Sequence, residues 1–463
     1  MFPREIYESR RKVLGRRLAE RLVVLPGHGE SPVNFRANSY PFRQDSTFLY
    51  YVGIDRPDLV AVIDSDGAET TLYGDESTLD DIVWTGHGPT LAERAEAVGI
   101  ARTRPLAALR DDVQTAIRSD RGIAFLPPYR AETILLLSDV LGIDTAHVAP
   151  QASVELIRAV AEQRSRKAPE EVAEIERAVE VSVDMHVAAI RMAAPGVSER
   201  EIAAEVARIA DASGGRLAYP SIATVEGQTL HNHAYVNELR EGDLFLLDAG
   251  AETAAGYAGD LTSTFPVAAD FTGPQRDIHE IVMEAYRVSV AAVAPGVPNR
   301  DVHFAAARVV FDGMKSLGIM RGDREEAIAA GAHALVFPHG IGHMLGLDVH
   351  DMESFGEEHV GYDGEARSEQ FGLRFLRLAR PLEEGFVLTI EPGVYFIPQL
   401  IDDWKVRGHC AEFVDYSRID RWRDFGGFRN EENFLVTTEG ARRLGPRKPQ
   451  TLDEIRTVRN SAP

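Results

Sequence analysis

The chain has 463 residues, too many for one compact hydrophobic core, so two domains are expected. Its 44% apolar and 26% charged residues are typical of a soluble globular protein. A formal net charge of −22 argues against non-specific binding to nucleic acid or to an anionic membrane.

The single cysteine and the N-terminus indicate the compartment. Cys410 excludes an internal disulfide framework, fits a reducing environment, and is interpreted as a lone packed or surface thiol. Residues 1–27 are charged and helix-periodic, without the apolar core of a signal peptide. No segment approaches the roughly 20 apolar residues that a membrane span needs. We therefore expect a cytoplasmic protein.

Residues 1–165 alternate predicted helices and strands, which indicates an α/β domain without catalytic chemistry. A helix is expected at 5–20, and 59–73 predicts a β-hairpin that turns at Ser65-Asp66-Gly67. Further helical patterns lie at 91–99, 106–118 and 130–142. The polar stretch 161–171 marks the boundary with a second domain at 166–463, because Pro169 and the two glutamates after it suit the first turn of a new helix.

The second region contains an internal repeat. Residues 192–209 and 292–310 share the pattern A-P-G-V-x-x-R-[ED]-[IV], and each follows a long helical pattern, at 170–192 and 274–293. Strand-like sequence follows each copy. Two copies are too few for a solenoid. We therefore predict a duplicated unit of a helix pair plus strands, related by pseudo-two-fold symmetry, with a site that draws residues from both halves.

Two strand-like segments of the first half carry aspartates. Residues 243–250 form an apolar run that ends on Asp248, and 260–267 begin on Asp260 and alternate in polarity. Small residues between them allow the chain to turn back. The two segments are predicted to pair antiparallel, which would bring both aspartates to one end.

Two strand-like segments of the second half carry glutamates. Residues 386–396 alternate as far as Glu391, and 428–436 place Arg429 and Glu431 on one predicted face. An acid after a buried apolar run is costly unless something pairs with it. Several carboxylates with one or two histidines suit divalent Mn, Co or Zn, and they can bridge two ions for amide or phosphoester hydrolysis.

Residues 337–351, FPHGIGHMLGLDVHD, contain three histidines, His339, His343 and His350. The first two have the spacing of a zinc-protease helix, but glycines flank them and the glutamate of that motif is absent. No lysine or Walker spacing supports a phosphate loop. GLDVHD alternates like a strand, so we expect loop and strand positions, with one histidine as a metal ligand and the others as donors or proton carriers.

These segments together carry a family resemblance. The chain resembles the pita-bread metallopeptidases over roughly 170–440, in the branch of Xaa-Pro aminopeptidase and Xaa-Pro dipeptidase (prolidase). Residues 40–58 resemble the N-terminal domain of the aminopeptidase P type. The segments that carry the catalytic-domain resemblance are LLDAG, GYAGDLTSTFP, HGIGH, GLDVHD, TIEPGVYF and GFRNEENFLVT.

The resemblance implies an α+β pita-bread catalytic domain that holds two divalent metal ions, with manganese first and cobalt or zinc as alternatives. It assigns Asp248 to one ion, Asp260 and Glu431 to both, and His343 and Glu391 to the second. It makes Glu391 also the general base.

The resemblance also implies the residues that contact the substrate. His350 would donate hydrogen bonds and carry protons, with His339 close by, and His231 would contact the substrate. Arg429 would brace the carboxylates or the substrate. His233 has no such implication and is expected to be solvated or packed.

Three departures from the family pattern affect these assignments. Twelve positions separate Asp248 from Asp260, so a bulge or a longer loop is expected between them. The motif after Arg429 reads Asn-Glu-Glu-Asn, which leaves Glu432 as an alternative to Glu431. Asn232 follows His231 where an aromatic residue is common.

The implied activity is hydrolysis of the Xaa-Pro bond at the N-terminus of small peptides, by a homodimer or homotetramer without nucleic-acid or membrane partners. The N-terminal region favours the aminopeptidase, whereas the segments 351–390 and 391–428 look closer to prolidase. A metal-free creatinase-like hydrolase and a non-enzymatic peptide- or histone-binding relative share the fold, but the retained ligand set argues against both.

Overall fold

The computed structural model describes residues 1–18, 20–67, 69–267 and 270–461. The chain divides into two compact units, one made of Met1–Arg164 with Ser354–His359, the other of Ser165–Glu353 and Val360–Pro463. We retain 165/166 as the proposed domain boundary.

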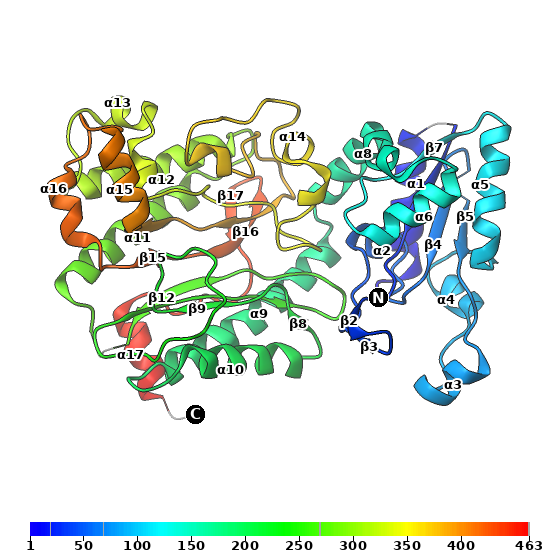
Figure 1. Ribbon diagram of the computed structural model, residues 1–463, viewed down its shortest axis with the longest axis horizontal. Coiled ribbons are helices and arrows are strands. Elements are labelled where there is room, and N and C mark those ends of the chain that lie inside the picture. Colours follow the sequence, from blue (N-terminus) through cyan, green and yellow to red (C-terminus); the bar gives the residue numbers. More distant parts are fainter. Residues whose placement is uncertain (19, 68, 268–269, 462–463) are drawn as a thin grey trace. The chain divides into compact units, whose positions relative to one another are not determined.

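The first unit is built on a five-stranded mixed sheet of order β6-β5-β4-β1-β7. Strands β4, β5 and β7 of this sheet are labelled in Figure 1. In that sheet β4 runs antiparallel to β1 and β5, whereas β7 and β6 run parallel to their neighbours. Its elements are α1 (Arg4–Arg17), β1 (Arg21–Pro26), β2 (Pro32–Phe35), β3 (Asn38–Ser39), α2 (Ser46–Tyr51), β4 (Val60–Asp64), β5 (Thr70–Tyr73), α3 (Leu79–Thr85), α4 (Leu91–Ala97), β6 (Arg102–Arg104), α5 (Leu109–Arg118), β7 (Gly122–Ala124), α6 (Ala131–Leu141), α7 (Thr145–Val148) and α8 (Val154–Ser165).

The hairpin predicted at 59–73 is present as β4 and β5, and the helices predicted in this region are present with shifted ends. Valines of β1 and β4 pack with leucines of α5 and α6 in one apolar cluster, which forms the core of the unit. Within the described residues, no single helix is long and apolar enough to cross a membrane. One bent pair, Ala131–Leu141 with Thr145–Gln151 at 92°, meets the criteria of length and composition.

The second unit contains four long helices and short antiparallel sheets of order β12-β10-β9, β13-β16-β17, β14-β15 and β11-β8 (Figure 1). Its elements are α9 (Pro169–Met192), α10 (Glu199–Ala212), β8 (Arg216–Leu217), β9 (Ile222–Thr224), β10 (Leu244–Asp248), β11 (Ala251–Glu252), β12 (Thr262–Pro266), α11 (Gly273–Ala292), α12 (Asn299–Ser316), α13 (Arg324–Ala329), β13 (Val387–Ile390), β14 (Gly393–Tyr395), α15 (Pro398–Arg407), α16 (Tyr416–Ile419), β15 (Gly427–Arg429), β16 (Glu432–Thr437), β17 (Gly440–Arg443) and α17 (Leu452–Asn460), with α14 (Glu357–Val360) spanning the division between units.

The internal repeat is visible in the backbone. Helices α9 and α10 form the pair of the first half, and α11 and α12 form the pair of the second. The turn after α9 places Gly196 at φ +92°, and its N–H donates to Leu239 O; the turn after α11 places Gly296 at φ +83°, and its N–H donates to Leu382 O. Each turn therefore ties its helix pair to a following strand-like segment in the same way, as the repeat predicts.

Two predictions about strands are wrong, and a third strand begins later than predicted. GLDVHD is a series of bends and turns, because Gly346 N–H donates to Asp348 O and Asp351 turns back to pair its carboxylate with Lys167 Nζ at 2.7 Å. The predicted strand 428–436 is two strands, β15 and β16, which lie in different sheets. Asp260 also lies two residues before β12 rather than in it.

Candidate functional site

The two aspartates come from the ends of one hairpin. Strands β10 and β12 pair antiparallel with Asp248 opposite Thr262, so Asp260 comes close to Asp248. The twelve-position interval is filled by a loop that contains β11, which pairs with β8. Asp260 is fixed at its backbone, where its N–H donates to Asn433 Oδ1 at 3.0 Å and its carbonyl accepts from Asn433 Nδ2 at 2.5 Å.

The two glutamates come from the second half of the repeat. Glu391 follows β13 directly, at the break predicted there. Glu431 lies between β15 and β16, forms an isolated bridge with Thr262, and accepts a hydrogen bond from Thr262 Oγ1 at 2.6 Å. The alternative, Glu432, instead accepts from the Tyr286 hydroxyl. Of these two neighbouring glutamates, Glu431 is therefore the one that lies with the carboxylates of the first half.

His343 is the histidine of 337–351 that lies among these carboxylates. Its Nε2 is 3.3 Å from Asp260 Oδ2 and 3.7 Å from Glu391 Oε1. Its Nδ1 lies 3.0 Å from Met344 O, so an Nδ1–H donates there and leaves the Nε2 lone pair directed at the cluster. Burial lowers the pKa of His343 to about 4, so the ring is neutral and can act as a ligand near pH 7.

His350 lies beside His343, with 4.2 Å between the ring centroids. Its Nδ1–H donates to Glu353 Oε2 at 2.6 Å, which lowers the pKa of Glu353 to about 2. Burial, together with the neighbouring His343, lowers the pKa of His350 to about 4. Glu353 also pairs with Arg377, so a chain of contacts leads from Asp260 through the two histidines to that arginine.

His339 and Arg429 are joined through Tyr395. The Tyr395 hydroxyl donates to His339 Nε2 at 2.9 Å and accepts from Arg429 Nη1 at 2.8 Å. Arg429 also donates to Asp248 Oδ2 at 2.6 Å and to Thr262 Oγ1 at 3.1 Å. Burial lowers the pKa of His339 to about 3, so this ring too is neutral. Arg429 therefore contacts one carboxylate of the cluster, that of Asp248, directly.

His231 and His233 line the same cavity, with their rings stacked at 6.5 Å. Burial lowers the pKa of His231. His233 was expected to be solvated or packed, and the structure places it at the cavity wall with Nδ1 3.1 Å from Ser221 O. Asn232 is buried and donates to Thr224 Oγ1, and it does not line the cavity.

The cavity has a volume of about 590 Å³ and holds every predicted site residue in its wall. Apolar side chains complete the wall: Pro220, Ile222, Leu230, Pro338, Val349, Phe371, Phe375 and Ile397. A concave apolar wall with a few convergent polar groups is the usual form of a small-molecule or peptide site.

The residues fit a divalent cation. Ligand atoms of Asp260, His343 and Glu431 lie within 4.8 Å of one another, and all three residues are buried. Burial and mutual repulsion raise the pKa of Asp260, Glu391 and Glu431 well above their ordinary values. Because one arginine faces four carboxylates, a bound cation would offset the remaining repulsion, and an oxygen-rich set with one imidazole suits Mn, Co or Zn.

Three residues near the carboxylates were not found from the sequence. The Tyr219 hydroxyl lies 2.6 Å from Asp248 Oδ1 and 2.5 Å from Asp260 Oδ1. Thr262 and Tyr395 hold Glu431 and Arg429 as described above. Thr262 could have been found by its alternation with Asp260, and Tyr395 by its place after Glu391, whereas Tyr219 lies in a segment without a recognisable pattern.

Cys410 is buried and donates to Ala330 O at 3.5 Å, and burial raises the pKa of its thiol to about 11. It is a packed thiol without the lowered pKa of a nucleophile, as expected.

The sequence is similar to two protein-family models and to known proteins. The model of metallopeptidase family M24 matches residues 173–438, and that of the aminopeptidase P N-terminal domain matches 7–124. The Xaa-Pro aminopeptidase of Escherichia coli K12 is 30% identical over 473 residues, which cover 98% of this chain and 97% of that protein.

Solved structures also match over almost the whole chain. Zinc-substituted E. coli aminopeptidase P in complex with product gives a TM-score of 0.81 at 28% identity, covering 99% of this chain and 98% of the other. Proline aminopeptidase P II from Yersinia pestis gives 0.82 at 28% identity, covering 99% of both chains. These matches confirm the family resemblance and the predicted fold class of both domains.

Proposed function

The chain belongs to metallopeptidase family M24, and from this we propose that it is an Xaa-Pro aminopeptidase, a metal-dependent hydrolase that removes the N-terminal residue from peptides with proline at the second position. The observation that carries the proposal is the buried Asp260–His343–Glu431 cluster in the wall of a peptide-sized cavity.

The proposed cofactor is a pair of divalent ions, with manganese first and cobalt or zinc as alternatives. Asp248 would hold one ion, Asp260 and Glu431 would hold both, and His343 and Glu391 would complete the second site. Bound there, the ions would supply Lewis-acid polarisation of the scissile carbonyl and activation of water.

Glu391 is proposed as the general base. Its Oε1 lies 3.7 Å from His343 Nε2 and its Oε2 lies 3.8 Å from His339 Nδ1, so its two oxygens face different partners. It would take a proton from the attacking water and pass it to the proline nitrogen as the C–N bond breaks. The tertiary amide of proline has no N–H of its own, so the leaving nitrogen depends on this proton.

The histidines are proposed to hold the substrate. The carboxylate of Glu353 orients the His350 ring and would stabilise it when it takes a second proton, which suits a donor and proton carrier beside the leaving group. His339 and His231 would contact the peptide from the same cavity wall. Arg429 would keep Asp248 in place through their 2.6 Å hydrogen bond.

Two measurements test the proposal. Hydrolysis of an Xaa-Pro-Yaa tripeptide is expected to exceed that of an Xaa-Pro dipeptide, whereas the reverse order would make the protein a prolidase. Metal analysis is expected to find bound or rebindable Mn, Co or Zn.

Neighbouring glutamates provide a matched control for the metal site. Glu431→Gln should lose metal binding, whereas Glu432→Gln, whose carboxylate faces Tyr286, should keep it. No rebindable metal in the unaltered protein, together with no Xaa-Pro hydrolysis, would favour a metal-free relative.

The proposed partners are small peptides, without nucleic acid or membrane. We propose a homodimer or homotetramer, which light scattering of the purified protein would establish. The cytoplasmic location stays a prediction from the sequence.

A further inference from the structure

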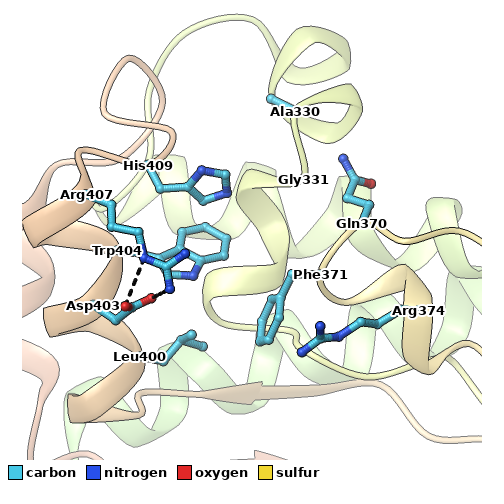
Figure 2. Close-up of a pocket in the computed structure, with 10 residues that line it drawn as sticks. All are labelled: Ala330, Gly331, Gln370, Phe371, Arg374, Leu400, Asp403, Trp404, Arg407 and His409. Atoms are coloured by element: carbon cyan, nitrogen blue, oxygen red, sulfur yellow. Dashed lines mark hydrogen bonds and ion pairs between the residues drawn. The ribbon is translucent and has the colours of Figure 1, made fainter.

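The second unit contains another cavity, of about 470 Å³, whose lining residues are drawn in Figure 2. Helix α15 forms one side with Leu400, Asp403, Trp404 and Arg407, and the segment 370–374 forms the other. Trp404 contributes an aromatic ring to the lining, with Phe371 at 5.9 Å and His409 at 4.4 Å between ring centroids.

The two cavities share a wall. Phe371 lines both, while Phe375 lines the active-site cavity and Arg374 the second one. The start of α15 also lies between the two cavities. Ile397, which precedes α15, lines the first cavity, and Leu400 lines the second. The two cavities are therefore neighbours, with Phe371 in the wall of each.

The charges of the second cavity leave one cation without a carboxylate. Arg407 pairs with Asp403, with Nε 2.9 Å from Oδ1. Arg374 has no carboxylate partner among the residues that the structure describes, and its guanidinium carbon lies 5.2 Å from the ring centre of Phe371 and 4.7 Å from that of Phe375. Two rings thus hold the guanidinium in place while its N–H donors stay available.

The charges around the two cavities favour one orientation of a bound peptide. Asp248, Asp260, Glu391 and Glu431 gather in the wall of the first cavity, and the contacts through His343 and His350 lead from them to Arg377, which lines the same cavity and lies three residues after Arg374. A peptide has a cationic N-terminus and an anionic C-terminus. The complementary orientation places its N-terminus at the carboxylates and its C-terminus towards Arg374.

We propose that this second cavity, between α15 and the segment 370–374, binds the C-terminal part of the peptide substrate, with Arg374 pairing with the terminal carboxylate. The inference rests on the proposed aminopeptidase function and specifies its substrate as peptides longer than a dipeptide that carry a free C-terminus. Leu400, Phe371 and Trp404 contact the side chains that precede that terminus.

The test compares Arg374→Gln with the unaltered enzyme on a series of Xaa-Pro peptides from two to six residues, each as the free acid and as the C-terminal amide. For the free acid that best fits the cavity, KM rises about fivefold, the effect expected from losing one partly exposed, ring-supported ion pair. Dipeptide hydrolysis, hydrolysis of the amides and kcat stay unchanged.

Arg200→Gln provides the matched control, because it removes the same charge from an exposed position on α10, away from both cavities. A second variant, Leu400→Trp, fills the cavity and should raise KM for the longer peptides while leaving the dipeptide unaffected.

The outcomes are separable. If the unaltered protein cleaves no Xaa-Pro peptide, the proposed function fails. If it cleaves them but Arg374→Gln changes KM equally for all lengths, equally for acids and amides, or for none, only the second-cavity proposal is overturned.

Discussion

At the scale of single residues, Glu391 is the side chain on which the proposed chemistry depends most directly. Glu391→Gln keeps the size and one oxygen of the group but removes its capacity to accept a proton. We expect kcat to fall by about 10²–10⁴, the usual contribution of a general base. Because Glu391 is also a proposed ligand of the second ion, kcat is compared in samples that elemental analysis shows to hold the same amount of metal, and near-normal turnover with the metal in place would refute the assignment.

Tyr219 supports the carboxylates without being one of the predicted ligands. Because its hydroxyl contacts both Asp248 and Asp260, Tyr219→Phe should weaken metal binding by about 10–100-fold, as is typical when a group that orients a ligand is lost. Titration against a chelating dye would measure it.

Tyr235→Phe is the control for this substitution, because its hydroxyl donates to Ser221 O rather than to an acid. Equal metal affinities for Tyr219→Phe and the unaltered protein would show that the hydroxyl does not position the ligands.

The acids were predictable at this scale because each follows or precedes an apolar, alternating run, where an unpaired charge is costly. Asp248 and Glu391 lie at the predicted strand ends. Tyr219 was not predictable, because its role arises from a segment that approaches the hairpin only in the folded chain. Its neighbours in sequence give no signal of that approach.

At the scale of elements, the internal repeat was predictable because both copies contain the same turn residues, a proline followed by a glycine with positive φ. The strand predicted for GLDVHD failed for the opposite reason. Alternating polarity arises equally from a tight turn whose polar groups face inward, and here the buried ion pair of Asp351 with Lys167, both 1% exposed at the side chain, determines the local path. A partner 184 residues away cannot be read from local periodicity.

The short helix η3 (Ala332–Leu335), which precedes the histidine-rich segment, carries a buried titratable group. Neither ring nitrogen of His333 has a hydrogen-bond partner in the described part of the chain, and burial lowers its pKa from 6.5 to about 4. His303 packs beside it at 5.8 Å, and its pKa is lowered as well. Both rings are therefore neutral in the folded state near pH 7.

This burial predicts a dependence of stability on pH. As pH falls below 6.5 the unfolded chain takes up a proton at His333 before the folded chain does, so stability present above pH 6.5 is lost progressively towards pH 4. The loss corresponds to about 3 kcal/mol for this group. His333→Leu should reduce the fall in unfolding free energy over that range, measured by urea denaturation.

The exposed His87→Leu serves as the control for this measurement. Parallel pH curves for His333→Leu and the unaltered protein would mean that His333 is accessible to protons in the folded state.

At the scale of the whole molecule, the two-domain organisation followed from length, composition and the polar stretch near Pro169. The meeting of the two halves of the repeat at one cluster was expected from the duplication. The detail that joins them, the bridge between Thr262 and Glu431, was not, because it depends on where β15 ends and β16 begins. The second cavity could not be predicted either, since α15 and the segment 370–374 show their common surface only once both are folded.

The concentration of all proposed ligands in one unit predicts how the whole chain responds to metal removal. A cation that binds only the folded state stabilises it by about 2.7 kcal/mol at a concentration 100 times its dissociation constant. Chelation should therefore lower the melting temperature of the unit that contains residues 165–353 and 360–463 by about 5 °C or more.

The unit that contains Met1–Arg164 should melt unchanged, because it supplies no proposed ligand. Differential scanning calorimetry with and without chelator would resolve the two transitions. Asp260→Asn should make the catalytic unit insensitive to added metal, since it removes one carboxylate shared by the proposed ions and also relieves part of the repulsion that raises the pKa of Glu431. If the melting temperature of this variant still rises with added metal, the ion binds at another site. If the melting temperature of the unaltered protein does not change with metal, the cluster does not bind it.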